Sequence, residues 1–176
     1  MLSEKQLIKQ CQQFQEFAQF ELVKRYTAML MSVSRRYAMD EAMAKDIVQE
    51  TFLLIFKNIE NYQPRGSFEA WMRKITIRCA LKWINQKCYK KEECIATYTE
   101  CLSSIEPKIY SQLSTQEILK LIKELPTGFR VILNLFLIEG YSHKEIAELL
   151  GIKESTSRSQ LARAKKIMAA KINALI

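Results

Sequence analysis

Glycine and proline are scarce in this chain, which has four glycines and three prolines among 176 residues. Sheet proteins need frequent turns, and turns are built largely from these two residue types. The chain is instead rich in Leu, Ile, Lys, Glu, Gln and Ala, most of which are strong helix formers. Hydrophobic residues make up 48% of the sequence, which is enough for a packed core. These features predict an all-α protein.

Apolar residues recur at three- and four-residue steps through the N-terminal half, which is the spacing of a buried helix face. Ser3 and Gln6 predict a capping box at a helix start, and Asp40 is placed to cap the next helix. Pro64 and Gly66 mark a turn, and a third long helix is expected over about 68–86. The expected buried residues are Leu22, Tyr26, Met29, Val33, Tyr37, Ala44, Ile47, Val48, Phe52, Ile55, Phe56 and Ile59.

The periodicity decays over residues 88–113, which mix both charges with scattered Ser and Thr. We interpret this stretch as a flexible linker. Order resumes at Ser114, which is spaced to form a capping box with Glu117. The sequence therefore predicts two small helical domains, residues 1–87 and 114–176.

Residues 142–166 have the spacing of a helix-turn-helix motif. Ser142 and Glu145 predict a capped first helix, and Gly151 allows a left-handed turn after it. A second helix is expected to begin near Ser155 or Thr156, with Leu161 and Ala164 facing inward. In this motif the second helix enters the DNA major groove.

The candidate duplex contacts on that second helix are polar or basic. Residues 152–176 hold six Lys or Arg and one Glu, which favours phosphate binding. A solvated basic face on a helical hairpin is the alternative interpretation. The candidate residues are Thr156, Arg158, Ser159, Gln160, Arg163 and Lys165.

The net charge of +8 favours a polyanionic partner, either nucleic acid or an acidic membrane surface. No stretch is long enough to span a bilayer, and the first residues lack the apolar segment of a secretory signal. We therefore expect a cytoplasmic protein without membrane insertion. The five cysteines lack the paired spacing of zinc sites, so we expect reduced free thiols, no metal and no cofactor.

Three further clusters are candidate interfaces, and each could also be an ordinary solvated surface. Lys74, Arg78 and Lys82 are four residues apart and share one helix face beside aromatic residues, a pattern that suits single-stranded nucleic acid. The loop at 61–67 offers the polar and stacking groups that a flipped base needs, from Asn61, Tyr62, Gln63, Arg65 and Ser67. Asp46, Gln49 and Glu50 would repel phosphates, so they indicate a protein partner.

The order of these segments resembles the extracytoplasmic-function sigma factors, the two-domain promoter-recognition subunits of bacterial RNA polymerase. The resemblance covers nearly the whole chain. In the first domain it runs through AKDIVQETFLLIFKNI and GSFEAWMRKI. In the second it runs through ELPTGFRVILNLFLIEGYSHKEIAELLGIKESTSRSQLARAKK. The pattern DxxQE, followed after a weak linker by LPxxxRxIxxLxxxEGxSxxEIAxxLG, is highly specific.

The resemblance implies a role for each cluster. Asp46, Gln49 and Glu50 would bind the clamp helices of the largest subunit of core RNA polymerase. The loop at 61–67 would capture a flipped base of the minus-ten promoter element, and the basic stripe would hold the melted strand. The helix-turn-helix would contact the minus-thirty-five element. Many members are held inactive by an anti-sigma factor, which is a further candidate partner.

The chain departs from the family pattern in three places. Arg78 replaces a frequent Asn and Gln160 a frequent Arg, so strand contact and base preference are expected to differ. Ser155-Thr156-Ser157 stands where Gly-Thr-Val is usual. Ser157 puts a hydroxyl where an apolar side chain packs, which either loosens the motif or bonds back to the preceding turn.

Three other functions compete with that of a sigma factor. A stand-alone helix-turn-helix transcription regulator leaves the cluster at 46–50 and the segment 61–83 unexplained. A membrane-surface protein needs the apolar faces that two cores would use. An enzyme needs a nucleophile–base pair, a Gly-rich phosphate loop or metal-ligand spacing, and we find none, so no small-molecule substrate is expected.

Overall fold

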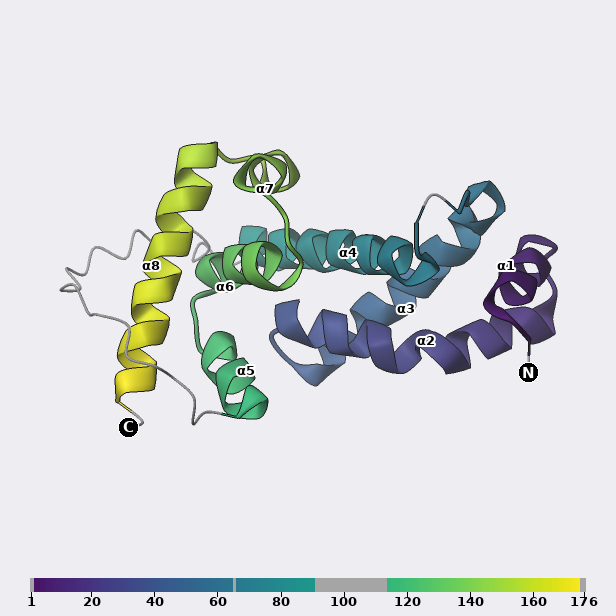
Figure 1. Cartoon of the computed structure of the whole chain (residues 1–176), viewed down its shortest axis with the longest axis horizontal. Coiled ribbons are helices and arrows are strands. Elements are labelled where there is room, and N and C mark those ends of the chain that lie inside the picture. The colour runs from purple at the N-terminus through teal and green to yellow at the C-terminus, as the bar shows by residue number, and fades with distance from the viewer. Residues whose placement is uncertain (1, 65, 91–113, 175–176) are drawn as a thin grey trace. The chain divides into compact units, whose positions relative to one another are not determined.

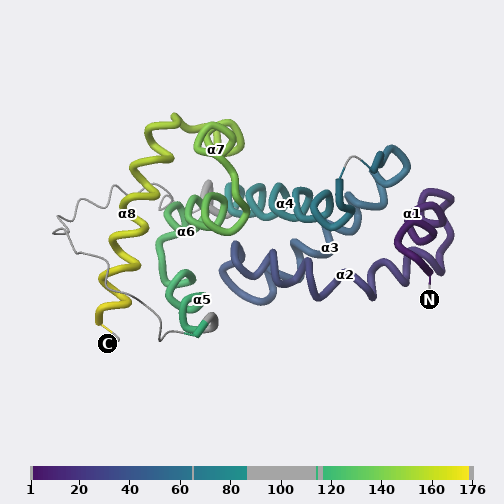
Figure 2. The backbone as a smooth tube through the Cα atoms, in the orientation of Figure 1, coloured from purple at the N-terminus to yellow at the C-terminus, as the bar shows by residue number. Residues whose placement is uncertain are grey.

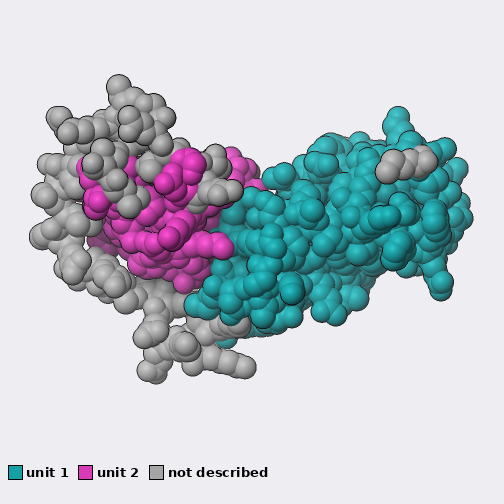
Figure 3. Space-filling model, turned by 90° about the horizontal axis from the view of Figure 1, so that it is seen from below, with its two compact units in different colours: residues 1–87 teal, residues 88–176 magenta. Residues whose placement is uncertain are grey.

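The computed structural model describes residues 2–64, 66–90 and 114–174, and every regular element in these ranges is helical (Figure 1). The predicted all-α fold is confirmed. The chain divides into two compact units, Met1–Lys87 and Cys88–Ile176 (Figure 3). The elements of unit 1 are α1 (Glu4–Gln12), α2 (Glu16–Tyr37), α3 (Glu41–Asn58), the short 3₁₀ helix η1 (Ile59–Asn61) and α4 (Phe68–Lys90).

The helix starts of unit 1 follow the capping signals in the sequence. Ser3 and Gln6 form the predicted capping box at α1. Asp40 caps α3 by accepting a hydrogen bond from the Met43 amide at 2.7 Å. The apolar faces of α1 to α4 and of η1 then meet in one core, whose buried members include Leu7, Cys11, Ala18, Leu22, Leu30, Tyr37, Ala44, Ile47, Ile55, Ile59, Met72 and Ala80.

The break between α1 and α2 was not predicted, because the sequence has no Gly, Pro or Asn there. Phe14 adopts the left-handed conformation, with φ 57°. Its amide donates to Cys11 O at 3.0 Å, and the Gln15 amide donates to Gln10 O at 3.1 Å. This pair of bonds is the Schellman motif that closes a helix, with Phe14 where glycine is usual. Figure 2 traces the reversal that it produces.

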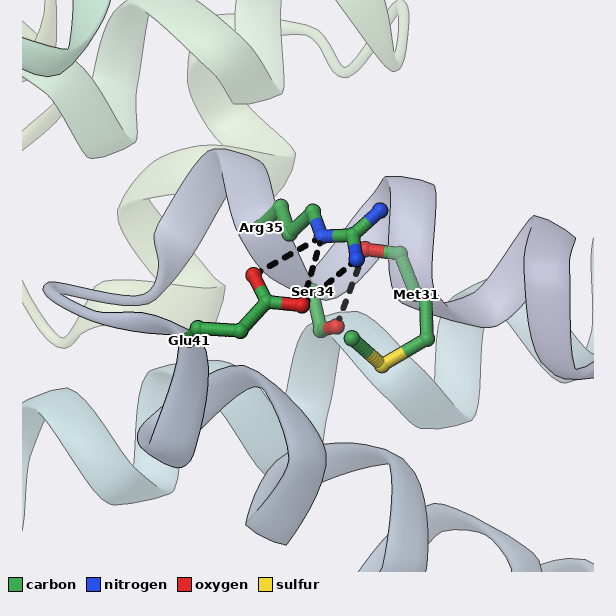
Figure 4. Close-up of polar contacts among 4 residues, drawn as sticks. All are labelled: Met31, Ser34, Arg35 and Glu41. Atoms are coloured by element: carbon green, nitrogen blue, oxygen red, sulfur yellow. Dashed lines mark hydrogen bonds and ion pairs between the residues drawn. The ribbon is translucent and has the colours of Figure 1, made fainter.

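The corner between α2 and α3 is held by an ion pair. Arg35, in the last turn of α2, donates from Nε and Nη2 to both carboxylate oxygens of Glu41, at 2.5–3.2 Å (Figure 4). Beside it, the Ser34 hydroxyl donates to Met31 O at 3.2 Å. Glu41 is the first residue of α3, where its negative charge also interacts favourably with the positive end of the helix dipole. Both side chains of the pair are about half exposed, so the pair orients the corner more than it stabilises it.

The third long helix extends further than predicted. It was expected to end near residue 86, but α4 runs to Lys90 and so includes the first three residues assigned to the linker. No Gly or Pro occurs between Ser67 and Pro107, so nothing in the local sequence stops the helix at residue 87. The rest of the predicted linker, 91–113, lies outside the described residues.

Unit 2 contains α5 (Thr115–Lys123), α6 (Thr127–Leu133), the π-helical segment η2 (Asn134–Ile138), α7 (His143–Leu150) and α8 (Glu154–Asn173). The predicted capping boxes at Ser114 and Ser142 are both present. Gly151 has φ 66°, the left-handed conformation expected between α7 and α8. The core residues come from every element of this unit: Leu121, Ile122, Leu125, Phe129, Val131, Ile132, Leu133, Leu135, Ile146, Leu161, Ala164, Met168 and Ile172.

The start of α8 corrects one expectation. The helix begins at Glu154, one residue before the earlier of the two predicted starts, and Lys153 stands at the N-cap without a side-chain hydrogen bond. Leu161 and Ala164 face inward, as predicted. The cap position lacks Ser, Thr, Asp or Asn, so the residue pattern could not fix this boundary.

Candidate nucleic-acid and protein interfaces

The loop after η1 is built around Tyr62, which is half buried rather than freely exposed. Its ring lies 5.1 Å from the Phe68 ring and 4.8 Å from the Trp71 ring, centroid to centroid. The Tyr62 hydroxyl is 3.4 Å from Gly66 O. Trp71 was missed as a candidate in the sequence. Its half-exposed ring lies beside Tyr62. The sequence could have indicated this, because Trp71 lies only four residues after Ser67 and so falls in the first turn of α4, next to the loop.

The other polar groups of this loop are exposed. Asn61 ends η1, and Gln63 and Ser67 are open to solvent. Ser67 also caps α4, because its Oγ accepts from the Ala70 amide at 3.0 Å. Arg65 lies outside the described residues. The loop therefore presents exposed amide groups beside a fixed aromatic wall, which is the combination that base stacking and base-edge recognition need.

The basic stripe on α4 is exposed as predicted, but one of its members is already paired. Lys74 and Arg78 are open to solvent. Lys82 is also exposed, and its Nζ lies 2.7 Å from Glu50 Oε1 on α3. Lys82 is therefore partly neutralised within the protein, so Lys74 and Arg78 carry most of the free positive charge of the stripe.

Glu50 faces α4 rather than the open surface. Its side chain is only 26% exposed, and its Oε2 accepts from Trp83 Nε1 at 2.5 Å. The hydrogen bond from Lys82 lowers the pKa of the Glu50 carboxyl, burial opposes this, and the Trp83 bond adds to the lowering. The same pair raises the pKa of Lys82. Glu50 thus joins two helices, whereas the sequence grouped it only with Asp46 and Gln49.

Asp46 and Gln49 form an exposed strip on α3, and the structure adds a third member to it. Both are open to solvent, and Leu53 continues the same face one turn later with 65% of its side chain exposed. Residues at steps of three and four share one face of a helix. A single exposed leucine is common on protein surfaces, so Leu53 joins the strip because of its position on the same helix face as Asp46 and Gln49. Leu53 belongs to none of the clusters predicted from the sequence.

The predicted reading face on α8 is mostly exposed. Arg163 and Lys165 are open to solvent, and Arg158 is exposed but bonded to Glu154, one turn earlier. Thr156 is half buried, and its carbonyl accepts from the exposed Ser159 hydroxyl at 3.0 Å. The remaining candidate, Gln160, does not face outward as expected. It is half buried, with Oε1 3.8 Å from the place of a Cβ on Gly128.

The joint between α7 and α8 contains the only histidine of the chain. Ser157 is fully buried, and its Oγ lies 2.9 Å from His143 Nδ1. The His143 ring stacks on Phe136, 4.5 Å between centroids. The Ser157 hydroxyl therefore bonds across to α7 rather than back to the preceding turn. Both helices are held at a fixed joint, which is the property that a groove-reading motif requires.

The two cysteines whose side chains are described, Cys11 and Cys79, are buried free thiols. Burial raises the pKa of Cys11 to about 11, and it also raises the pKa of Cys79. Within the described part of the chain, no group of His, Cys, Asp and Glu is arranged to hold a metal ion. No helix in those same ranges is long and apolar enough to cross a membrane.

Two family models match the chain, one in each unit. Residues 22–87 match sigma-70 region 2, and residues 115–168 match sigma-70 region 4. The first match spans the α3 strip, the loop and the basic stripe. The second spans most of unit 2, including the helix-turn-helix.

Curated relatives carry the same description. A sigma factor SigE of the extracytoplasmic-function group from Mycolicibacterium smegmatis is 30% identical over 83% of this chain, which spans 58% of that relative. The sigma-E factor of Haemophilus influenzae is 24% identical over 99% of this chain and 98% of its own length. The Escherichia coli sigma-E factor is 23% identical over 99% of this chain and 97% of its own length.

Solved structures show the same fold. CnrH, solved in complex with the cytosolic domain of CnrY, is 22% identical, with a TM-score of 0.51 and 96% of each chain covered. The sigma factor RpoE from Bartonella quintana, solved with the anti-sigma factor NepR, is 18% identical, with a TM-score of 0.53. That match covers 84% of this chain and 92% of RpoE. The two sigma-70 regions, which together span most of the chain, and the curated relatives show that the chain belongs to the extracytoplasmic-function group of sigma-70 RNA polymerase sigma factors.

Proposed function

We propose that this chain directs core RNA polymerase to specific promoters and aids promoter melting at the start of transcription. The observation that carries the proposal is that three candidate interaction surfaces lie together on unit 1. One small unit matched to sigma-70 region 2 displays an exposed protein-docking strip, a polar loop beside an aromatic wall, and a basic helix face. A region 4 helix-turn-helix follows it in the chain.

Each surface has a role in this proposal. The strip formed by Asp46, Gln49 and Leu53 docks on the polymerase. The loop at 61–67 captures a flipped base of the minus-ten element, and Lys74 and Arg78 hold the phosphates of the melted strand. Glu50 supports the strip from behind by fixing α3 to α4.

The exposed face of α8 reads the minus-thirty-five element in the major groove. Arg158, Ser159 and Arg163 are the base-edge candidates, and Lys165 is a phosphate contact. Arg158 must exchange Glu154 for a DNA partner when it binds. This small exchange costs little, because exposed ion pairs on a helix are weak.

One further partner and one location belong to the same proposal. RpoE was solved with an anti-sigma factor, so an anti-sigma factor is a candidate regulator of this chain. The work of a sigma factor is binding rather than catalysis, so we assign the chain no enzymatic activity. It acts in the cytoplasm, with the polymerase. A stand-alone regulator is not favoured, because that function does not explain why unit 1 matches sigma-70 region 2.

Transcription in vitro tests this proposal directly. Core polymerase with and without the purified chain is incubated on a genomic library, and the start sites are mapped. We expect starts that depend on the chain and share a spaced pair of upstream elements. The proposal fails if the chain adds no start sites, or if it binds one duplex sequence tightly without polymerase.

Charge reversal tests the docking strip. Asp46 is exposed, and its side chain makes no hydrogen bond or ion pair with the described residues, so Asp46→Lys should leave the fold intact, with stability changed by no more than about 0.5 kcal/mol. Affinity for core polymerase should fall at least about tenfold, as expected for loss of an interface contact. Glu60→Lys makes the same charge change at an exposed position of η1 and should bind normally. Equal binding by both variants would remove Asp46 from the interface.

A further inference from the structure

Gln12 connects the last turn of α1 to the loop that follows α3. Its side-chain Nε2 donates to Ile59 O at 3.1 Å and to Tyr62 O at 3.3 Å. Ile59 O also accepts from the Tyr62 amide at 3.1 Å. One amide group therefore binds two carbonyls at the end of η1, where helical carbonyls lack partners of their own.

The helix that carries Gln12 is firmly placed. Leu7 and Cys11 of α1 are buried in the core of unit 1. The Tyr26 hydroxyl of α2 donates to Glu4 Oε2 at 3.0 Å, which ties the first turn of α1 to α2. The turn at Phe14 closes the other end. Gln12 thus holds the loop from an element whose position the core determines.

The loop has a second attachment on its far side. Ser67 caps α4 through the Ala70 amide, and the Tyr62 ring packs on Phe68 and Trp71. Between these attachments Gln63 is exposed. The hydrogen bonds from Gln12 therefore hold the N-terminal end of the loop, and the aromatic packing on α4 holds its C-terminal end.

We propose that Gln12 is a positioning residue that fixes the minus-ten loop in the shape that receives a base. This inference rests on the proposed function of the loop and extends it to α1, which precedes the segment matched to sigma-70 region 2. A loop held in its bound shape loses less conformational entropy on binding than a free loop does. Without the amide of Gln12, two carbonyls lose a donor, and the entry to the loop gains freedom.

A pair of matched substitutions isolates the hydrogen bonds. Gln12→Met keeps the length of the side chain and removes the donor. Gln13→Met makes the same change one residue later, at an exposed position whose side chain bonds only with Gln15 among the described contacts. Gln12→Lys restores an N–H donor, and Gln13→Lys controls for the added charge.

Two measurements report on the loop. Hydrogen exchange followed by mass spectrometry gives the protection of residues 59–63 in the full chain. Fluorescence anisotropy gives the affinity of the holoenzyme for a single-stranded oligonucleotide carrying a minus-ten sequence from the start-site mapping. For Gln12→Met we expect faster exchange at 59–63, normal protection in α3, and affinity lowered about tenfold, the effect of losing one or two hydrogen bonds. Gln12→Lys should restore slow exchange at 59–63 and tight oligonucleotide binding, so that both match the values for Gln13→Lys.

The outcomes separate this inference from the proposed function. If Gln12→Met matches Gln13→Met in exchange and affinity, Gln12 does not position the loop. Weaker binding with unchanged exchange would also overturn the inference. Asn61→Ala and Gln63→Ala test the loop itself. If they bind the oligonucleotide as the unaltered chain does, the proposed role of the loop fails, whatever Gln12 does.

Discussion

Glu50 of α3 binds Lys82 of α4 directly, with Glu50 Oε1 2.7 Å from Lys82 Nζ. Its other oxygen accepts from Trp83 Nε1 at 2.5 Å. One carboxylate therefore joins the helix that carries the docking strip to the helix that carries the basic stripe. Reversing the charge of Glu50 would place two cations together and leave the indole donor without an acceptor. A test of polymerase docking should accordingly change Asp46 and leave Glu50 intact.

The Glu50 contacts predict a stability difference that depends on pH. Glu50→Gln should lower the free energy of unfolding of unit 1 by about 1 kcal/mol at neutral pH, since the hydrogen bonds to charge are partly exposed. The pKa of Glu50 is below its ordinary 4.5 in the folded chain, so its contribution is full above that value and is lost as pH falls through the folded pKa. Both tryptophans lie in unit 1, so tryptophan fluorescence during urea unfolding measures it. A difference that stays constant down to acid pH would contradict the assignment.

Leu53 predicts an apolar contribution to polymerase docking. Leu53→Ser should weaken binding to core polymerase about tenfold, because a leucine buried at an interface is worth between one and two kcal/mol. Stability should not fall, since the side chain is 65% exposed in the free chain. Leu137→Ser is the matched control, at an exposed leucine of unit 2. Titration of labelled polymerase measures both. Equal affinities would exclude Leu53 from the strip.

Lys165 predicts a change in salt dependence rather than in sequence preference. Lys165→Ala should reduce the slope of log affinity against log salt concentration by about one for duplex promoter DNA bound by the holoenzyme. The ranking of mutated minus-thirty-five sequences should stay the same, because a phosphate contact carries no base information. Lys24→Ala, an exposed change on α2, provides the control. An altered ranking would show that Lys165 reads a base.

Phe14 predicts a stabilising substitution. A left-handed residue other than glycine costs about 1–2 kcal/mol, and the exposed Phe14 ring recovers little of this by burial. Phe14→Gly should therefore stabilise unit 1 by about 0.5–1 kcal/mol, after allowance for the greater freedom of glycine in the unfolded chain. Gln13→Gly, at a residue with φ −91°, should destabilise it. Urea unfolding compares the two, and a destabilised Phe14→Gly variant would show that the ring has a packing role.

The residue pattern alone is enough to predict the helices, most of their buried residues and several of their ends. Capping boxes at Ser3, Ser114 and Ser142 involve residues three apart, and the left-handed turn at Gly151 depends on one residue. Such features are local, so the residue pattern contains all of the physics that forms them. The exposure of Asp46, Lys74, Arg78 and Arg163 followed from the same periodicity, because a helix with one buried face must expose the other.

The contacts between those helices, in contrast, are seen only in the folded chain. Glu50 meets Lys82 and Trp83 across 32 and 33 residues of sequence, and Gln12 reaches Tyr62 across 50. Ser157 is satisfied by His143 on the preceding helix, and Phe14 takes a glycine's conformation so that α1 and α2 can share a core. These contacts depend on the distances between helices, which are set by the packing of many side chains at once. No local pattern records that packing.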